Sequence, residues 1–342
     1  MTKRIEWLDN LKAVAIILVV LRHIMQANIT DCSQTVVGNA IFAVQMPMFM
    51  IIAGYFSITS DRYYSNLKGV KAYIGKRLIH YMLPFFAWYI FVYVLLRGFY
   101  KRNIFLAIKI LINNVDVGLW FLYVVFVLSV VSVLANMVCH KLKIRSKTGL
   151  VLIFIGGVIL FPLLILGMFN GMRFLGINLL AYYYLYFSLG YLLFYNRKTI
   201  RNILNSKVVL VILGIIAGLV FLGIVFNYNI ELAPDSVTNI CIRVVAALSG
   251  STVIAILVYY LSLKNQSNKL LSIIGQNTLE IYVVHLHYIG VLPKGTHYLY
   301  TLDGVFTFLI AFVITILMTA ITIIVIKKVS VLNYIFFGKK ST

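Results

Sequence analysis

Two ionisable side chains, one at each end of the first apolar stretch of the chain, are spaced so that they lie on one side of a helix. Lys12 and His23 lie 11 positions apart in LDNLKAVAIILVVLRHI, which is otherwise apolar from Ala13 to Leu21. At about 100° per residue they share a helical face, about 16 Å apart along the axis. A lysine near the membrane boundary can extend into water, but an imidazole is too short to do so. His23 is therefore a candidate for proton transfer, with a histidine hydrogen-bonded between helices as the alternative.

A second polar cluster lies near the end of the chain, in IGQNTLEIYVVHLH. It places Asn277, Glu280, His285 and His287 in otherwise apolar sequence. In one continuous helix, Glu280 and His287 would share a face, and His285 would be offset from both. Because ionisable residues are costly within a bilayer, they indicate function by default. A proton relay and a structural hydrogen-bond network would give the same pattern.

Basic residues at two further places could bind anions. Arg243 begins the eighth apolar stretch, where it could pair with Glu280 or bind an anionic substrate. Lys76, Arg77 and His80 lie in KAYIGKRLIHYMLPFF, at the start of the third stretch. Converging positive groups at one membrane face could hold the phosphates of a nucleotide-like cofactor, or could only determine topology.

The composition indicates which elements must position these residues. The chain has 342 residues, of which 62% are hydrophobic and 11% charged, and its mean hydropathy is +0.98. Soluble domains are about one quarter charged, so this is an integral membrane protein. Since a span needs roughly 20 apolar residues, we predict an all-α polytopic membrane helical bundle of about ten transmembrane helices, in a single domain of residues 1–342. The spans are expected near 8–30, 36–58, 78–97, 118–138, 149–169, 176–195, 207–227, 239–263, 272–292 and 304–327.

The positive charge is explained by topology. With both termini in the cytoplasm, 21 of the 30 Lys and Arg residues fall in cytoplasmic segments and six in outer ones, as the positive-inside rule requires. The net charge of +21 therefore does not indicate nucleic-acid binding. The outer segment 97–118 departs from the rule and is expected to form an amphipathic helix in the interface, or a lid over an outer-facing substrate site.

The three cysteines lack metal-ligand spacing, so no metal is expected; a Cys32–Cys241 bridge is conceivable but has no positive support.

Five short elements, in order from residue 9 to residue 285, resemble the acyltransferase 3 family of membrane O-acyltransferases. The closer similarity is to its fucose 4-O-acetylase-like sugar acetyltransferases. The elements are Asp9 followed by Lys12-x10-His23, and then MPMFMIIAGYF, KRLIHYMLP, GLWFLYV and IGQNTLEIYVVH. Each motif is weak alone, but the ordered set covers nearly the whole chain.

The resemblance implies ten spans and the transfer of an acyl group from acyl-coenzyme A, on the cytoplasmic side, to a hydroxyl group, commonly of a sugar. His23 inherits the role of catalytic residue and Lys12 that of an essential basic residue. The family's Arg-x-x-Arg pattern, thought to hold the coenzyme, is here Arg77-x-x-His80, with Lys76 as a possible compensation. Gln45 and Ala53 stand where related sugar acetylases often have His and Ser, which leaves the acceptor open.

We therefore expect an O-acetyltransferase that moves an acetyl group from cytoplasmic acetyl-CoA to a hydroxyl of a cell-surface or lipid-linked sugar. The alternative is a transporter or flippase for a polyprenyl-linked saccharide. His23 would act as general base or as transient acetyl carrier. The expected site comprises catalytic His23, Glu280 and His285; cofactor-binding Lys12, Lys76, Arg77 and His80; and substrate-binding Asp9, Trp120, Arg243 and Asn277.

No permanently bound cofactor is expected, because acetyl-CoA is the acyl donor. The expected partners are acyl-CoA, a saccharide or glycolipid acceptor and membrane lipid. The expected location is a cell membrane, multi-pass, and most simply the bacterial plasma membrane.

Overall fold

The computed structural model describes residues 6–57, 61–91, 103–115, 119–143, 173–231, 236–264, 268–292 and 295–339. These residues form helices joined by turns and short loops, with no strand among them. The fifth predicted span, 149–169, and the end of the third, 92–97, lie outside this part of the chain. The backbone divides into two compact units, Met1–Phe49 with Thr199–Val325 and Met50–Lys198 with Ile326–Thr342. The single domain stays a prediction.

Six helices in the described ranges are long and apolar enough to cross a membrane. They match the second, fourth, sixth, seventh, eighth and tenth predicted spans, and are Val36–Phe56, Trp120–Lys141, Phe174–Tyr195, Lys207–Asn227, Val237–Leu263 and Leu302–Lys328. The prediction of an all-α, multi-pass membrane helical bundle is thereby confirmed. The number of ten spans and the cytoplasmic side of both termini stay predictions.

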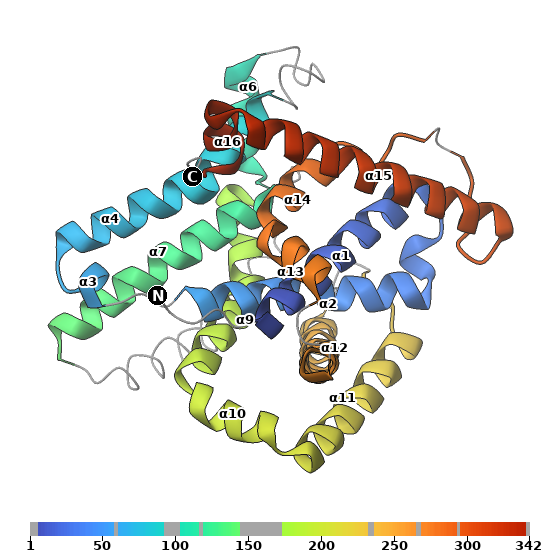
Figure 1. Ribbon diagram of the computed structural model, residues 1–342, viewed down its shortest axis with the longest axis horizontal. Helices are drawn as coiled ribbons and strands as arrows, with labels where there is room; N and C mark the ends of the chain where they lie inside the picture. Colours follow the sequence, from blue (N-terminus) through green and yellow to red (C-terminus); the bar gives the residue numbers. More distant parts are fainter. Residues whose placement is uncertain are drawn as a thin grey trace. The chain divides into compact units, whose positions relative to one another are not determined.

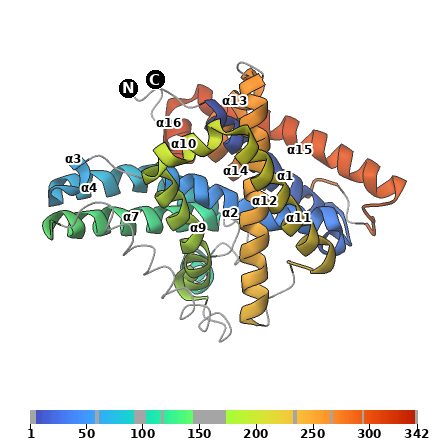
Figure 2. The ribbon, with the colours of Figure 1, turned by 90° about the horizontal axis from the view of Figure 1, so that it is seen from below.

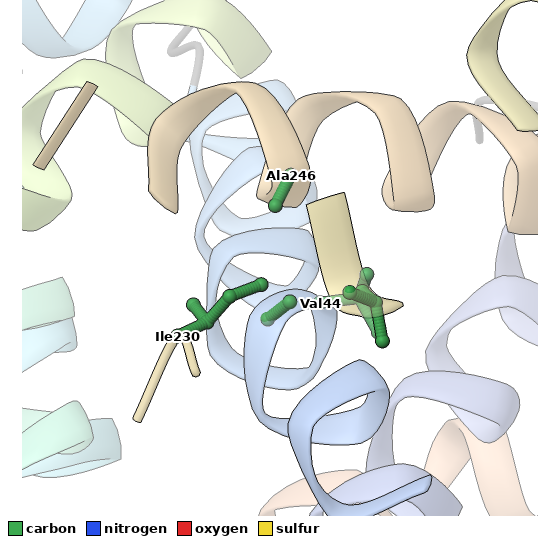
Figure 3. Packing of buried hydrophobic residues seen from close by; sticks show 5 residues of the cluster. Val44, Ile230 and Ala246 are labelled. Atoms are coloured by element: carbon green, nitrogen blue, oxygen red, sulfur yellow. The ribbon is translucent and has the colours of Figure 1, made fainter. Parts of the chain in front are cut away.

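In the first unit, α1 packs against α12, α13 and α14, as Figures 1 and 2 show. The unit comprises most or all of α1 (Glu6–Asn28), η1 (Cys32–Gln34), α2 (Val36–Phe56), α10 (Arg197–Asn205), α11 (Lys207–Asn227), α12 (Val237–Lys264), α13 (Lys269–Gln276), α14 (Thr278–His285) and α15 (Leu302–Lys328). Part of its core is the cluster of Val44, Ile230 and Ala246 drawn in Figure 3, which joins α2 and α12 to the segment that follows α11.

The ninth predicted span is two short helices rather than one continuous helix. Asn277 separates them with a non-helical backbone at φ −109° and ψ 21°. Its side-chain amide donates to the carbonyl of Ile273 at 2.7 Å, which satisfies one of the last carbonyls of α13. Helix α14 ends at His285, and turns follow. The helical face expected to be shared by Glu280 and His287 does not exist, because His287 lies beyond the end of α14.

The second unit contains α3 (Asp61–Tyr64), α4 (Leu67–Arg77), η2 (Leu78–Met82), α5 (Leu83–Trp88), α6 (Ile104–Asn113), α7 (Trp120–Lys141), η5 (Phe174–Gly176), α9 (Ile177–Tyr195) and α16 (Ser330–Phe337). Helices α4 and α7 run side by side in both views. The end of α2 meets α9 through two glycines: a Cβ on Gly54 would strike the carbonyl of Phe187, and one on Gly190 the carbonyl of Ile51. Only glycine allows backbones to approach this closely.

The third predicted span is interrupted by a π-helical turn at its start. Pro84 has no N–H and cannot bond the carbonyl of His80 four residues earlier. The N–H of Leu83 instead bonds the carbonyl of Leu78, five residues back. In the described part of the 97–118 segment, the predicted helix is confirmed as α6, with Ala107 buried.

Candidate active site

His23 and His285 meet where α1 packs against α14. Their ring centroids lie 5.4 Å apart, with the ring planes inclined at 45°. His285 is 0% exposed, whereas His23 is half-buried. The structure thus brings together two of the three predicted catalytic residues, and His23 is the more accessible of the two.

The hydrogen bonding of His285 determines which of its ring nitrogens is basic. Nδ1 lies 2.9 Å from the carbonyl oxygen of Ile281. A carbonyl only accepts, so Nδ1 donates and Nε2 keeps its lone pair. Nε2 is buried and has no hydrogen-bond partner in the described part of the chain. This nitrogen can accept a hydrogen bond, and the centroid of the His23 ring lies 5.4 Å from that of His285.

Glu280, the third predicted catalytic residue, lies in the first turn of α14 and is 0% exposed. A carboxylate is favoured there by the partial positive charge of the helix N-terminus. Tyr282 lies between Glu280 and His285 in sequence, and its ring centroid is 6.1 Å from that of His285. Glu280, Tyr282 and His285 therefore come from one eight-residue helix, and His23 comes from α1.

Lys12 lies near the start of α1, three turns before His23. Its Nζ is 3.1 Å from Asp9 Oδ1, in an i,i+3 ion pair whose side chains are 24% and 9% exposed. The neighbouring Asn10 donates to Ser262 Oγ of α12 at 2.9 Å. Asp9, predicted to bind substrate, thus contacts the predicted cofactor-binding lysine, while Asn10 joins this end of α1 to α12.

Asn277 and Arg243 occupy different parts of the first unit. Asn277 separates α13 from α14, and its predicted role in substrate binding stays a prediction. The guanidinium carbon of Arg243 lies 5.8 Å from the ring centroid of Phe42, which is within range of a cation–π interaction. Arg22 approaches the same ring at 5.7 Å.

The remaining predicted residues belong to the second unit. Arg77 lies between two tyrosines, with Nη1 3.3 Å from Tyr81 Oη and its guanidinium carbon 5.0 Å from the ring of Tyr73. The His80 ring contacts Tyr81 edge-on at 4.8 Å, and Lys76 is exposed in the last turn of α4. The three predicted cofactor-binding residues of this unit therefore lie within two consecutive turns of backbone.

Trp120, also in the second unit, stacks on Tyr183 of α9. The ring centroids are 4.7 Å apart and the planes are inclined at 25°. Trp120 is half-buried, so part of this flat aromatic surface is accessible. Its predicted role in substrate binding stays a prediction.

Sequence reasoning missed Arg22 as a site residue. It is 1% exposed and forms an ion pair with Glu231, which follows α11. It also donates to the sulfur of Cys32. Cys32 and Cys241 are both free thiols, so the conceivable bridge is not formed. A signal was present, since Arg22 is a charge within an apolar stretch and the whole chain has only nine acids.

Ionisable side chains buried within a multi-pass helical bundle indicate a functional site, in membrane enzymes and in transporters alike. When the chain is compared with protein families, the model of an acyltransferase domain matches residues 5–327. The protein belongs to the acyltransferase 3 family and is thereby indicated to be a membrane acyltransferase. No curated protein and no solved structure matched the chain in the same comparisons.

Proposed function

We propose that the protein is an O-acetyltransferase that moves an acetyl group from cytoplasmic acetyl-CoA to a hydroxyl of a cell-surface or lipid-linked sugar, in a bacterial plasma membrane. The observation that supports this most directly is the contact between His23 and His285, within a chain that matches an acyltransferase domain over residues 5–327. The similarity to sugar acetylases supports the choice of acetyl group and acceptor.

Transfer to an alcohol requires a base for the hydroxyl proton and donors for the developing oxyanion. In the general-base route, the partly buried His23 takes the proton as the acceptor oxygen attacks the thioester carbonyl. The C–S bond then breaks, and the coenzyme thiolate recovers the proton from the imidazolium. In the carrier route, a neutral His23 nitrogen attacks the thioester carbonyl, and the C–S bond breaks to release the coenzyme thiolate. The acceptor oxygen then attacks the acetyl-imidazolium, the C–N bond breaks, and the hydroxyl proton passes to the thiolate. In both routes, His285 lies in contact with His23, and its Nε2 keeps a lone pair that can accept a hydrogen bond.

The length of α1 suits a long acyl donor. Lys12 and His23 lie on one continuous helix, about 16 Å apart along its axis. A pantetheine-like arm could span that distance, with Lys12 near the phosphates and His23 near the thioester. The second unit carries its own group of basic side chains suited to phosphate, Lys76, Arg77 and His80. The Trp120–Tyr183 stack offers an apolar face for a sugar ring.

The break at Asn277 is the one observation that favours the alternative function. Transporters commonly bind their substrates where membrane helices are interrupted, and α13 and α14 are separated in this way. A flippase for a polyprenyl-linked saccharide would need no coenzyme A, so donor binding distinguishes the two functions.

The first experiment measures label transfer or hydrolysis from acetyl-CoA by purified protein in lipid, with wild type beside His23→Ala. His140→Ala is the matched control, because His140 is exposed at the end of α7. All three proteins are first shown to be folded, and their binding of coenzyme A is measured. We expect turnover in wild type and His140→Ala, and its loss in His23→Ala. Equal turnover in all three would leave His23 structural, and no coenzyme A binding by any would support the flippase.

A further inference from the structure

We propose that Arg22 is a positioning residue, whose ion pair with Glu231 fixes the orientation of the end of α1 and so directs His23 towards His285. The effect on catalysis rests on the proposed function, whereas the effect on His23 itself does not. The proposal gives Glu231, just after α11, a part in positioning the catalytic histidine, although it is distant in sequence from both histidines.

Arg22 is held from several directions. Its guanidinium pairs with the Glu231 carboxylate and donates to the Cys32 sulfur. On another side, its guanidinium carbon lies over the ring of Phe42. The side chain is only 2% exposed. A guanidinium stays charged under all ordinary conditions, and a buried charge that loses its partner is strongly unfavourable. Arg22 therefore cannot leave this position unless Glu231 moves with it.

Glu231 is itself held in place by α2. The side-chain amide of Asn39 donates to the carbonyls of Val225 and Tyr228, at 3.0 and 2.6 Å. The carbonyl oxygen of the same amide accepts from the backbone N–H of Ile230 at 2.7 Å. Ile230 also packs in the cluster with Val44 and Ala246 shown in Figure 3. The carboxylate that receives Arg22 is therefore attached to a fixed segment of backbone.

The position of Arg22 determines that of His23 because the two residues are consecutive on one helix. They project about 100° apart around the axis, so Arg22 faces Glu231 and Phe42 while His23 faces α14. Rotation of the end of α1 cannot change one direction without changing the other. An anchored Arg22 thus holds His23 at the 5.4 Å ring contact with His285.

The test compares Glu231→Gln, Glu231→Asp and Asp303→Asn in vesicles. Glu231→Gln removes the negative charge with little change of shape, whereas Glu231→Asp keeps the charge on a shorter side chain. Asp303→Asn is the matched control, since Asp303 pairs with His297 at 2.5 Å in the same unit but is 68% exposed. Two readouts are taken: the kcat and KM for acetyl-CoA, and the rate of carbethoxylation of His23 and of His140 by peptide mass spectrometry.

We expect Glu231→Gln to lower kcat by about 10- to 100-fold, the usual effect of misplacing a reacting group by about 1 Å, while the KM for acetyl-CoA changes little. His23 should be carbethoxylated several-fold faster, with His140 unchanged. Glu231→Asp should keep most of the wild-type kcat, and Asp303→Asn should match wild type in both kcat and the reactivity of His23.

Equal kcat and equal His23 reactivity in Glu231→Gln and Asp303→Asn would overturn the proposal. Parallel acceleration at His23 and His140 would also overturn it, because it would indicate general loosening of the protein. If wild type transfers no acetyl group, the proposed function fails, but the reactivity of His23 still decides whether Arg22 positions it.

Discussion

A substitution at Gly275 tests whether α1 and α13 are in backbone contact beside Lys12. A Cβ added to Gly275 would strike the carbonyl oxygen of Asp9, with the carbonyl carbon at 2.8 Å and Cα at 3.2 Å. These are backbone atoms, which cannot turn aside as a flexible side chain could. Gly275→Ala must therefore push α13 away from the start of α1.

Comparison with Gly218→Ala isolates the cost of this displacement. Gly218 lies within α11, and no atom lies within 4 Å of its added Cβ. Both substitutions gain up to about 1 kcal/mol of helix propensity, but only Gly275→Ala also overpacks, at about 1–3 kcal/mol. The two variants should thus differ by about 1–3 kcal/mol in the free energy of unfolding. At roughly 2–4 °C per kcal/mol, Gly275→Ala should melt several degrees lower.

The assay is thermal unfolding in detergent, followed by tryptophan fluorescence. Trp7 on α1 contacts Tyr259 edge-on at 5.6 Å and so reports on the packing of α1. The KM for acetyl-CoA should rise in Gly275→Ala alone, because Asp9 holds Lys12. A Gly275→Ala protein as stable as Gly218→Ala would show that the helices have room for a methyl group, and would refute the reasoning.

Three further predictions concern single side chains. His285→Gln should lower kcat at least about tenfold in steady-state kinetics, with an unchanged KM for acetyl-CoA, because it removes the ring in contact with His23; an unchanged kcat would contradict this. Burial raises the pKa of the Cys32 thiol from 9.0 to about 11. N-ethylmaleimide at neutral pH should therefore label the exposed Cys241 before Cys32. The free energy of unfolding should fall as the pH rises from 9 towards 11, because over this range the thiol ionises more readily in the unfolded chain than in the folded one. Trp120→Ala should raise the KM for the sugar acceptor but not for acetyl-CoA, and Trp120→Phe should keep most of the stacking on Tyr183; equal effects on both substrates would argue against a role in acceptor binding.

The long apolar helices were predictable because hydropathy over about 20 residues reports what a bilayer accepts. The same averaging hides local interruptions. The break at Asn277 involves one residue, and the sequence around it stays apolar enough to suggest a continuous span. The π-helical turn before Pro84 had a visible cause in the proline itself, and its position could have been predicted.

The candidate site was predictable in its components but not in its contacts. Sequence placed His23 and His285 at similar depth on separate helices, but depth does not show which faces meet. The bond from His285 Nδ1 to Ile281 follows an i,i−4 spacing and was accessible from helical periodicity. The pairing of Arg22 with Glu231 was not, because it joins residues more than 200 positions apart through the packing of α2 and α11.

The two histidines are therefore held by different means. His285 is oriented by a carbonyl of its own helix, so its tautomer depends only on the local backbone of α14. His23 has no comparable bond among those described, and its direction follows from the end of α1, which Arg22 anchors to distant segments. A change at Asn39 or Glu231 should then displace His23 while the hydrogen bond of His285 is kept. This asymmetry leaves His285 as the fixed member of the pair and His23, the less buried of the two, as the member that distant substitutions can misalign.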